Sequence, residues 1–203
     1  MISVRNLSFS YDGKKDIIKD LSLDLNRGEI LGLMAPSGYG KSTLGRLIGG
    51  YMKRDSGEIL IDGEDIEKLS GFLPVQMVHQ SPEKNVNPNW KAGKILNEGL
   101  EVSSDIRDIL GIKEEFLGKF PAELSGGELQ RICIGRCLGP DTRYLIADEI
   151  TTMLDPISQA EICKNLIRLS RDKSIGIIFI SHSRALVENI GDRIIDLDLI
   201  NKI

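Results

Sequence analysis

The residues with the clearest chemical purpose form one short stretch around Lys41 and Ser42. They follow a loop with glycines at positions 38 and 40 and an apolar, strand-like run over 29–34. Such glycines let the backbone approach phosphate oxygens without a Cβ in the way, and the start of the next helix attracts anions. Lys41 could reach the β- and γ-phosphates of a nucleotide, and the Ser42 hydroxyl could ligate Mg²⁺. The stretch predicts a phosphate-binding P-loop formed by Ala35, Pro36, Ser37, Gly38, Tyr39, Gly40, Lys41, Ser42 and Thr43.

Ala35 departs from the usual pattern, in which this loop opens with glycine. If the position requires a positive φ, alanine there costs roughly 1–2 kcal/mol. We expect the loop to tolerate that cost, because its glycines and its Lys-Ser-Thr run are intact. A turn that binds nothing would not explain a lysine at this spacing.

Two neighbouring carboxylates, Asp148 and Glu149, end the apolar run over 144–147. Ligands of α/β sheets bind beyond the carboxyl ends of the strands, so we expect both acids near the P-loop. Asp148 could belong to the Mg²⁺ shell, and Glu149 could orient an attacking water. His182 follows the apolar run over 174–180 and could contact the γ-phosphate, although taken alone such a histidine is more often structural.

A second helix start that could receive phosphate is predicted at Ser125. Ser125 suits an N-cap, and Glu128 three residues later completes a capping-box pattern. Capping explains the serine, but it does not explain Gly126 and Gly127 beside it.

Strands and helices must alternate to position these residues. Alternating apolar and polar residues predict antiparallel strands over 2–7 and 21–25, joined by a turn. Tyr11 in that turn suits either an ordinary strand-end aromatic or a ring that stacks on adenine. Pro74 favours an edge position or an irregular start for its strand. Further strands are predicted over 29–34, 57–63, 72–78, 144–147, 174–180 and 193–199, and helices over 44–48, 125 to about 139, and 157–169.

Residues from about 83 to 123 differ in character from the rest. Apolar residues recur there at roughly helical spacing, which predicts a small helical insert. Trp90 could either help to dock a partner or simply pack the insert. The sequence therefore divides into 1–82, the insert over 83–123, and 124–203, all within one domain.

The composition fits one domain with a substantial core, since 41% of the 203 residues are hydrophobic. A net charge of −4 disfavours electrostatic binding to nucleic acid or to an anionic membrane. Apolar runs fall short of the roughly 20 residues that span a membrane, and the first residues lack the apolar core of a signal peptide. We therefore expect a cytosolic protein. Three cysteines suit reduced thiols in a core better than disulfides or a metal site: Cys133, Cys137 and Cys163.

With these motifs in order, the sequence resembles the ABC-type ATPases, the nucleotide-binding subunits of ATP-binding-cassette transporters. Residues 35–42 resemble Walker A, residues 124–128 the signature motif and residues 144–148 Walker B, and the likeness covers nearly the whole chain. The resemblance implies an α/β fold. Its P-loop NTPase core would be a mostly parallel sheet with helices on both faces, joined by an N-terminal antiparallel β subdomain and the helical insert.

The resemblance also implies roles for single residues. Tyr11 is similar to the aromatic residue that stacks on adenine, and Gln80 to the glutamine that senses Mg²⁺, contacts the ATP site and couples to the membrane subunit. Asp155 is similar to an aspartate that couples the two subunits of the dimer. Catalysis would fall to Glu149, His182 and Lys41. Magnesium would be held, partly through water, by Ser42, Gln80 and Asp148. The partner's ATP would be contacted by Ser125, Gly126, Gly127 and Glu128.

The implied assembly is a head-to-tail dimer that holds ATP and Mg²⁺, either two copies of this chain or one copy with a sister ATPase. Its further partners would be transmembrane permease subunits and a substrate-binding protein, with no nucleic acid. The implied location is the cytoplasmic face of the cell membrane, as a peripheral subunit.

Residues 79–82 and 146–155 resemble the dipeptide, oligopeptide and nickel importer branch. Many members of that branch continue beyond the last strand, whereas this sequence ends at Ile203. The expected function is therefore ATP hydrolysis coupled to movement of a small solute, such as a peptide, a metal or a metal chelate. The choice of solute and the direction of transport stay open.

Two other functions are compatible with the motifs. A soluble ABC ATPase of DNA repair or translation usually has a long coiled coil or a second cassette, and the acidic balance disfavours nucleic acid. A non-hydrolysing ATP-binding regulator gains slight support from Ala35. A phosphate-release assay separates the regulator from an enzyme.

Overall fold

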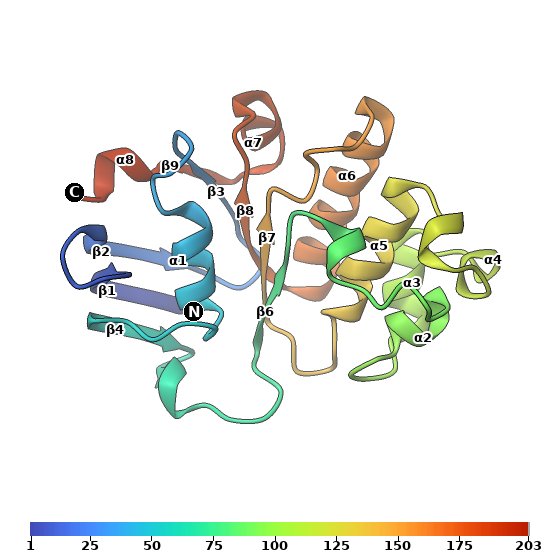
Figure 1. The fold of residues 1–203 in the computed structure, drawn as a ribbon, viewed down its shortest axis with the longest axis horizontal. Coiled ribbons are helices and arrows are strands. Elements are labelled where there is room, and N and C mark those ends of the chain that lie inside the picture. The colour runs from blue at the N-terminus through green and yellow to red at the C-terminus, as the bar shows by residue number, and fades with distance from the viewer. Residues whose placement is uncertain (203) are drawn as a thin grey trace.

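Residues 1–202 form two sheets and a series of helices in the computed structural model (Figure 1). The antiparallel sheet has the strand order β2-β1-β4-β5. Its strands are β1 (Ile2–Ser10), β2 (Asp16–Leu25), β4 (Ser56–Ile61) and β5 (Glu64–Asp65). The antiparallel pairing of β1 with β2 confirms the prediction for the start of the chain.

The second sheet is parallel throughout and has the strand order β6-β7-β8-β3-β9. Because the strands are parallel, their carboxyl ends meet at one edge, where the predicted site residues follow. Strand β6, which follows Pro74, is an edge strand of this sheet, as the proline favoured. The strands are β3 (Ile30–Met34), β6 (Val75–Val78), β7 (Tyr144–Asp148), β8 (Gly176–Ile180) and β9 (Arg193–Asp196).

Helix α1 (Lys41–Ile48) lies between the two sheets (Figure 1). Its Leu44 and Leu47 belong to a core that includes Val4 of the antiparallel sheet and Ile146 of the parallel sheet. Successive strand side chains point to opposite faces, so the neighbours of Ile146 enter a different core. The parallel sheet thus separates two hydrophobic layers.

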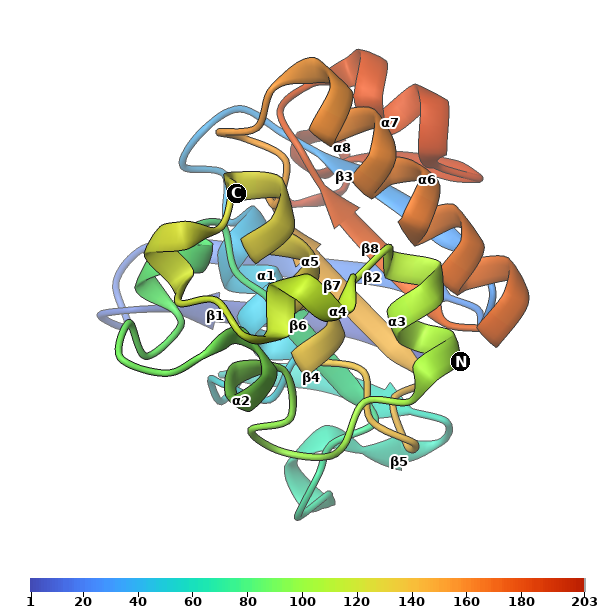
Figure 2. The same ribbon diagram turned by 90° about the vertical axis from the view of Figure 1, so that its right-hand side faces the viewer.

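The other face of the parallel sheet is covered by α5 (Gly126–Arg136), α6 (Pro156–Lys173) and α7 (Arg184–Ile190). The strand residues of this layer are almost all apolar, as expected of a sheet covered on both faces. Figure 2, which looks onto this side, shows the insert in front of α5 and the sheet.

The insert is helical, as predicted, but it has no separate core among the described residues. Its helices are η2 (Pro82–Lys84), α2 (Ala92–Leu96), α3 (Ser104–Leu110), α4 (Glu114–Leu117) and η3 (Pro121–Glu123). Ile95, Ile109 and Phe116 join the layer that contains α5 and α6. Trp90 packs against the same layer, with the Lys94 ammonium 3.9 Å from its ring centroid, which supports the packing role for Trp90.

Several predicted boundaries are wrong: the strands predicted over 57–63 and 72–78, for example, run over Ser56–Ile61 and Val75–Val78. Two further differences have a clear physical reason. The last strand ends at Asp196 rather than 199, and α8 (Leu197–Ile200) follows it. Asp196 pairs with Met34, and beyond Met34 the neighbouring strand becomes the P-loop, so residues 197–199 lack a ladder partner. Helix α5 ends at Arg136 instead of near 139, because the following loop is fixed by Thr142, whose hydroxyl bonds the main chain of 137 and 139.

The three cysteines are free and buried, which agrees with their predicted place in the core. Within residues 1–202, helices of the length and apolar character needed to cross a membrane are not found.

Candidate functional site

The P-loop runs from the end of β3 into α1, as the sequence predicts. Gly38 and Gly40 have φ of 87° and 85°, a left-handed conformation that favours glycine. The Gly40 carbonyl accepts the first helical hydrogen bond, from Leu44 N at 2.8 Å. The loop therefore turns sharply and presents the start of an eight-residue helix to the carboxyl edge of the sheet.

Ala35 causes no backbone strain. The residues of the loop with positive φ are the two glycines, whereas Ala35 is outside that region. The condition under which alanine would cost 1–2 kcal/mol is therefore not met. The alanine is accommodated without a penalty that would argue against a working loop.

The Lys41 ammonium lies inside the loop that precedes it. It donates to the Ala35 carbonyl at 2.7 Å and to the Pro36 carbonyl at 3.1 Å, and the residue is only 7% exposed. A buried ammonium needs such acceptors. Phosphate oxygens placed in the loop would offer the same group stronger, charge-assisted partners.

A cavity of about 430 Å³ opens over the loop. Tyr11 stands at this cavity, and its hydroxyl is 3.0 Å from the Thr43 hydroxyl, so its ring is tied to the first turn of α1. The ring also contacts Phe9 edge to face at a centroid distance of 5.0 Å. The cavity is lined by Tyr11, Ile17, Ser37, Gly38, Gly40, Lys41, Ser42, Thr43, Gln80 and Glu149.

The predicted carboxylates lie at the same edge. Ser42 donates to Asp148 at 3.1 Å, which places the first carboxylate beside the first turn of α1. Gln80 donates to Glu149 at 3.3 Å, and the His182 ring nitrogen Nδ1 lies 3.8 Å from the same carboxylate oxygen. The structure thus brings residues that are up to 140 positions apart in the chain, from Ser42 to His182, into one cluster.

Burial raises the pKa of Asp148, the neighbouring Glu149 charge adds to that rise, and the hydrogen bond from Ser42 opposes it. The carboxylate is thus destabilised as an anion and would gain from a cation. Glu149 itself has a φ of 50°, which is unusual for a residue with a side chain.

The donor set at this edge fits Mg²⁺. Hydroxyl, carboxylate and amide oxygens are the hard ligands that this ion prefers, and they are available from Ser42, Asp148 and Gln80. Clusters of three or more His, Cys, Asp or Glu with metal-binding geometry are not found in residues 1–202.

The signature residues and Asp155 lie away from the cavity lining. Ser125 caps α5, with its hydroxyl accepting from Glu128 N at 3.2 Å while the Glu128 carboxylate accepts from Ser125 N at 2.8 Å. This reciprocal pair confirms the predicted capping box. Asp155 caps α6 by accepting from the N–H groups of residues 157 and 158, each at 3.0 Å.

The remaining predicted residues of the loop have lesser contacts. Pro36 and Ala35 reach the site through their carbonyls, and Tyr39 is exposed. Ile17 of β2 lines the cavity but was not predicted, since in the sequence it is one apolar residue of an ordinary strand.

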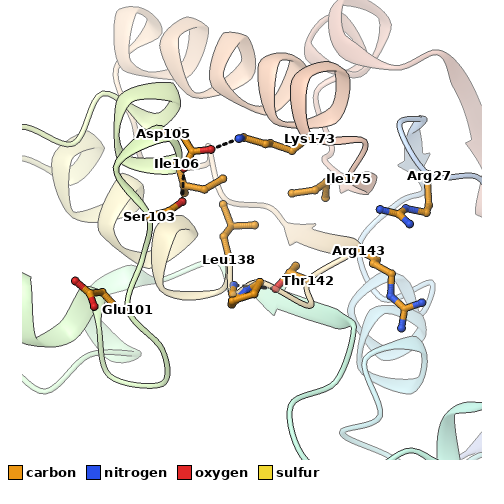
Figure 3. A pocket seen from close by; sticks show the side chains of 12 residues that line it. Arg27, Glu101, Ser103, Asp105, Ile106, Leu138, Thr142, Arg143, Lys173 and Ile175 are labelled. Carbon is orange, nitrogen blue, oxygen red and sulfur yellow. Dashed lines mark hydrogen bonds and ion pairs between the residues drawn. The ribbon is translucent and has the colours of Figure 1, made fainter.

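A second hollow, of about 390 Å³, lies at the opposite, amino ends of the parallel strands (Figure 3). Its Lys173 is ion-paired with Asp105, and its Arg143 with Asp62 at 2.5 Å. Because these charges already have carboxylate partners, the hollow is a weaker candidate for an anionic ligand than the P-loop cavity.

Comparison with known proteins agrees with this geometry. A family model described as "ABC transporter" matches residues 18–152. The chain is 33% identical over 217 residues to the oligopeptide transport ATP-binding protein OppF of Streptococcus mutans, covering 96% of this chain and 70% of that protein. It is 34% identical over 205 residues to the nickel import ATP-binding protein NikE of Rhodospirillum rubrum, covering 91% and 73%. It spans 66% of OppF of Bacillus subtilis, at 34% identity.

Among solved structures, the dimeric bacterial ABC transporter cassette MJ0796 matches with a TM-score of 0.81 and 25% identity, covering 97% of this chain and 94% of that one. A second structure of MJ0796, described as a post-hydrolysis state bound to ADP and phosphate, matches equally well. The P-loop NTPase fold is thereby confirmed. Motifs, fold and relatives together show that the chain belongs to the family of ABC transporter ATPases.

Proposed function

We propose that this chain hydrolyses ATP and couples the reaction to import of a small solute, a peptide or nickel, through separate membrane subunits. The observation that carries the proposal is the shared cavity edge. There the Ser42 hydroxyl of the P-loop donates to Asp148, and Glu149, which accepts from Gln80, lines the same cavity as Ser42.

In this proposal Lys41 exchanges its loop carbonyls for the β- and γ-phosphates of ATP. The backbone N–H groups around Gly38 and Gly40 bind the same phosphates, and Tyr11 stacks on adenine. The location of Tyr11 at the cavity and its hydroxyl contact with Thr43 support that role. The lysine then offsets the charge that grows on the phosphoryl oxygens in the transition state.

Glu149 orients the water that attacks the γ-phosphorus in line with the leaving group. Gln80, at 3.3 Å, and His182, at 3.8 Å, support this role because they approach the same carboxylate oxygen and restrict its orientation. His182 would contact the γ-phosphate. Ser42, Asp148 and Gln80 would hold Mg²⁺, which supplies charge neutralisation to the phosphates when bound.

Two chains would be needed for a complete site. The capped start of α5 and Asp155 lie outside the cavity of their own chain, so they are available to a second copy or to a sister ATPase. We propose that Ser125, Gly126, Gly127 and Glu128 close over the partner's ATP in a head-to-tail dimer. The dimeric state of the MJ0796 cassette supports this arrangement.

The solute and the remaining partners are inferred from the relatives. Proteins named for oligopeptide transport and for nickel import match most of this chain, which favours transport over a soluble ABC ATPase. We therefore propose transmembrane permeases and a substrate-binding protein as partners, and a position at the cytoplasmic face of the membrane. The unstrained Ala35 removes the feature that had favoured a non-hydrolysing regulator.

Phosphate release from Mg²⁺-ATP tests the proposal. We expect turnover by the unmodified protein and a loss of about 10²-fold or more for Glu149→Gln, with ATP binding retained. Glu115→Gln, the same chemical change at an exposed position of α4, should keep its turnover. Equal turnover by Glu149→Gln and the unmodified protein would remove Glu149 from the mechanism, and absence of turnover in both would overturn hydrolysis.

A further inference from the structure

Ile17 of β2 supplies an aliphatic side chain to the lining of the P-loop cavity. The rest of that lining consists of Tyr11, glycines and polar residues. Ile17 also packs against the loop itself, because a methyl group on Gly40 would lie 3.1 Å from both its Cγ2 atom and its carbonyl oxygen. The position of Ile17 therefore shapes the cavity beside the ring that stacks on adenine in the proposed function.

Ile17 lies in an edge strand of the antiparallel sheet, since β2 is first in the strand order. The outer side of such a strand carries N–H and C=O groups that need partners from outside the sheet. The side chain of Asn201 provides both partners. Its Oδ1 accepts from Lys19 N at 2.7 Å, and its Nδ2 donates to the Ile17 carbonyl at 2.8 Å. One amide thus takes the place of a neighbouring strand beside Ile17.

Asn201 is itself held in place at the end of α8. It is 4% exposed, and its N–H donates to the Leu197 carbonyl at 2.8 Å. Leu197 is fully buried in the core that contains Ile18 and Leu44. Helix α8 follows β9, whose neighbour β3 leads into the P-loop, so the helix connects that side of the loop with the edge of β2 (Figure 1). Loss of the amide would leave buried main-chain groups unpaired, which costs free energy.

We propose that Asn201 is a positioning residue of the nucleotide site. By fixing the outer edge of β2, it holds Ile17 against the P-loop and presents the isoleucine side chain as an apolar wall for the adenosine part of ATP. Small-molecule sites combine such apolar walls with a few polar groups. The inference rests on the proposed function, because the wall matters only if the cavity holds ATP. The bonds of Asn201 reach β2 and α8, whereas Lys41 and Glu149 belong to other elements, so the effect falls on affinity and not on the chemical step.

Equilibrium binding of Mg²⁺-ATP tests the inference. Asn201→Leu removes both amide bonds at similar side-chain volume. We expect it to raise the Kd for ATP about tenfold and to raise KM in proportion, with kcat at saturating ATP within about twofold of the unmodified protein. A general loss of structure would not divide the effect between KM and kcat in this way.

Asn165→Leu is the matched control. Asn165 is also buried, and its Nδ2 donates to the main-chain carbonyl of Leu110 at 3.1 Å, but neither residue lines the P-loop cavity. The variant should lower the melting temperature by several degrees and leave the Kd for ATP within about twofold. An equal rise in Kd for Asn165→Leu and Asn201→Leu would overturn the inference, as would an unchanged Kd for Asn201→Leu.

A double-variant cycle shows whether Asn201 acts through Ile17. Ile17→Ala should raise the Kd for ATP about tenfold, and adding Asn201→Leu should then change it by less than about threefold. Two effects that simply multiply would contradict the proposed link. If Asn201→Leu is insoluble, Asn201→Asp takes its place with the same expected rise, because it replaces the donor to the Ile17 carbonyl with an acceptor.

The same measurements keep this inference apart from the proposed function. An unmodified protein that binds no ATP would overturn both. An unmodified protein that binds ATP but releases no phosphate would overturn hydrolysis alone, and the Kd values of the variants would still decide the role of Asn201.

Discussion

At the scale of single residues, Glu149 stands out for its backbone as well as for its carboxylate. Its φ of 50° costs a residue with a Cβ about 1–2 kcal/mol. The neighbours impose this conformation, because Glu149 N–H donates to the Ile180 carbonyl at 3.0 Å and the Glu149 carbonyl accepts from Thr152 N at 3.1 Å. The fold thus tolerates local strain in order to aim one side chain at the cavity.

Replacing this residue should reverse the usual order of stability, in which an alanine variant is more stable than a glycine variant. Both Glu149→Ala and Glu149→Gly remove the carboxylate, but glycine accepts the left-handed conformation without strain. We expect the free energy of unfolding of Glu149→Gly to be about 1 kcal/mol larger than that of Glu149→Ala. Urea titration of the nucleotide-free proteins measures this difference. At an ordinary site alanine would be the more stable, and that result here would show that the backbone carries no strain.

The types and spacing of the site residues could be predicted from the sequence, because the P-loop and the acid pair each follow an apolar run. Their conformations could not. The left-handed backbone of Glu149 depends on a carbonyl of β8, and the contacts of Lys41 depend on how the loop curls around its ammonium group. The place of Ile17 at the cavity depends on how the antiparallel sheet packs, for which one strand offers no signal.

At the scale of elements, one ion pair fixes the end of the antiparallel sheet. Arg54 donates to both carboxylate oxygens of Asp65, at 2.9 and 2.6 Å, and to the Gly57 carbonyl at 2.9 Å. Both side chains are largely buried, with 14% and 19% of their surface exposed. Two parallel bonds of this kind join the segment before β4 to β5 more firmly than a single surface contact, and the bond to Gly57 extends the link to β4.

Arg54→Lys should lower the free energy of unfolding by about 1–3 kcal/mol at neutral pH, since lysine cannot make the paired bonds. The Arg54 guanidinium holds the pKa of Asp65 below its usual value. The stabilisation is therefore complete above the unfolded pKa of about 3.9 and is lost as pH falls through the lower folded value. Urea titrations at several pH values should show the two proteins converging in acid.

Arg5→Lys provides the comparison, because the Arg5–Asp24 pair is about 40% exposed and should contribute under about 1 kcal/mol. A loss of stability for Arg54→Lys no greater than this, or one unchanged in acid, would contradict the stabilising role of the Arg54–Asp65 pair.

Element types were largely predictable from periodicity. The boundary at Asp196 was not, because it depends on where the neighbouring strand stops.

At the scale of the whole molecule, the insert and the core should unfold together. The insert contributes Ile95 and Phe116 to the same hydrophobic layer as α5, α6 and the parallel sheet. Trp90, the only tryptophan, packs against that layer and reports on the insert. We expect its fluorescence and the far-UV circular dichroism to give one coincident urea transition.

Two separated transitions, with the fluorescence changing first, would instead show that the insert unfolds independently of the core. The helical nature of the insert could be predicted from its spacing of apolar residues. Its sharing of a core could not, because that depends on which faces of α2 and α4 meet α5 in three dimensions.

Strand β7 joins the chemistry of this protein to its packing. Leu145 and Ala147 fill one hydrophobic layer and Ile146 the other, and the strand then delivers Asp148 and Glu149 to the edge of the sheet. Loss or gain of one residue in this strand would exchange the contents of the two layers and turn the acids around. Evolution can therefore revise this edge by substitution, while insertions and deletions in the strand would be eliminated with the fold.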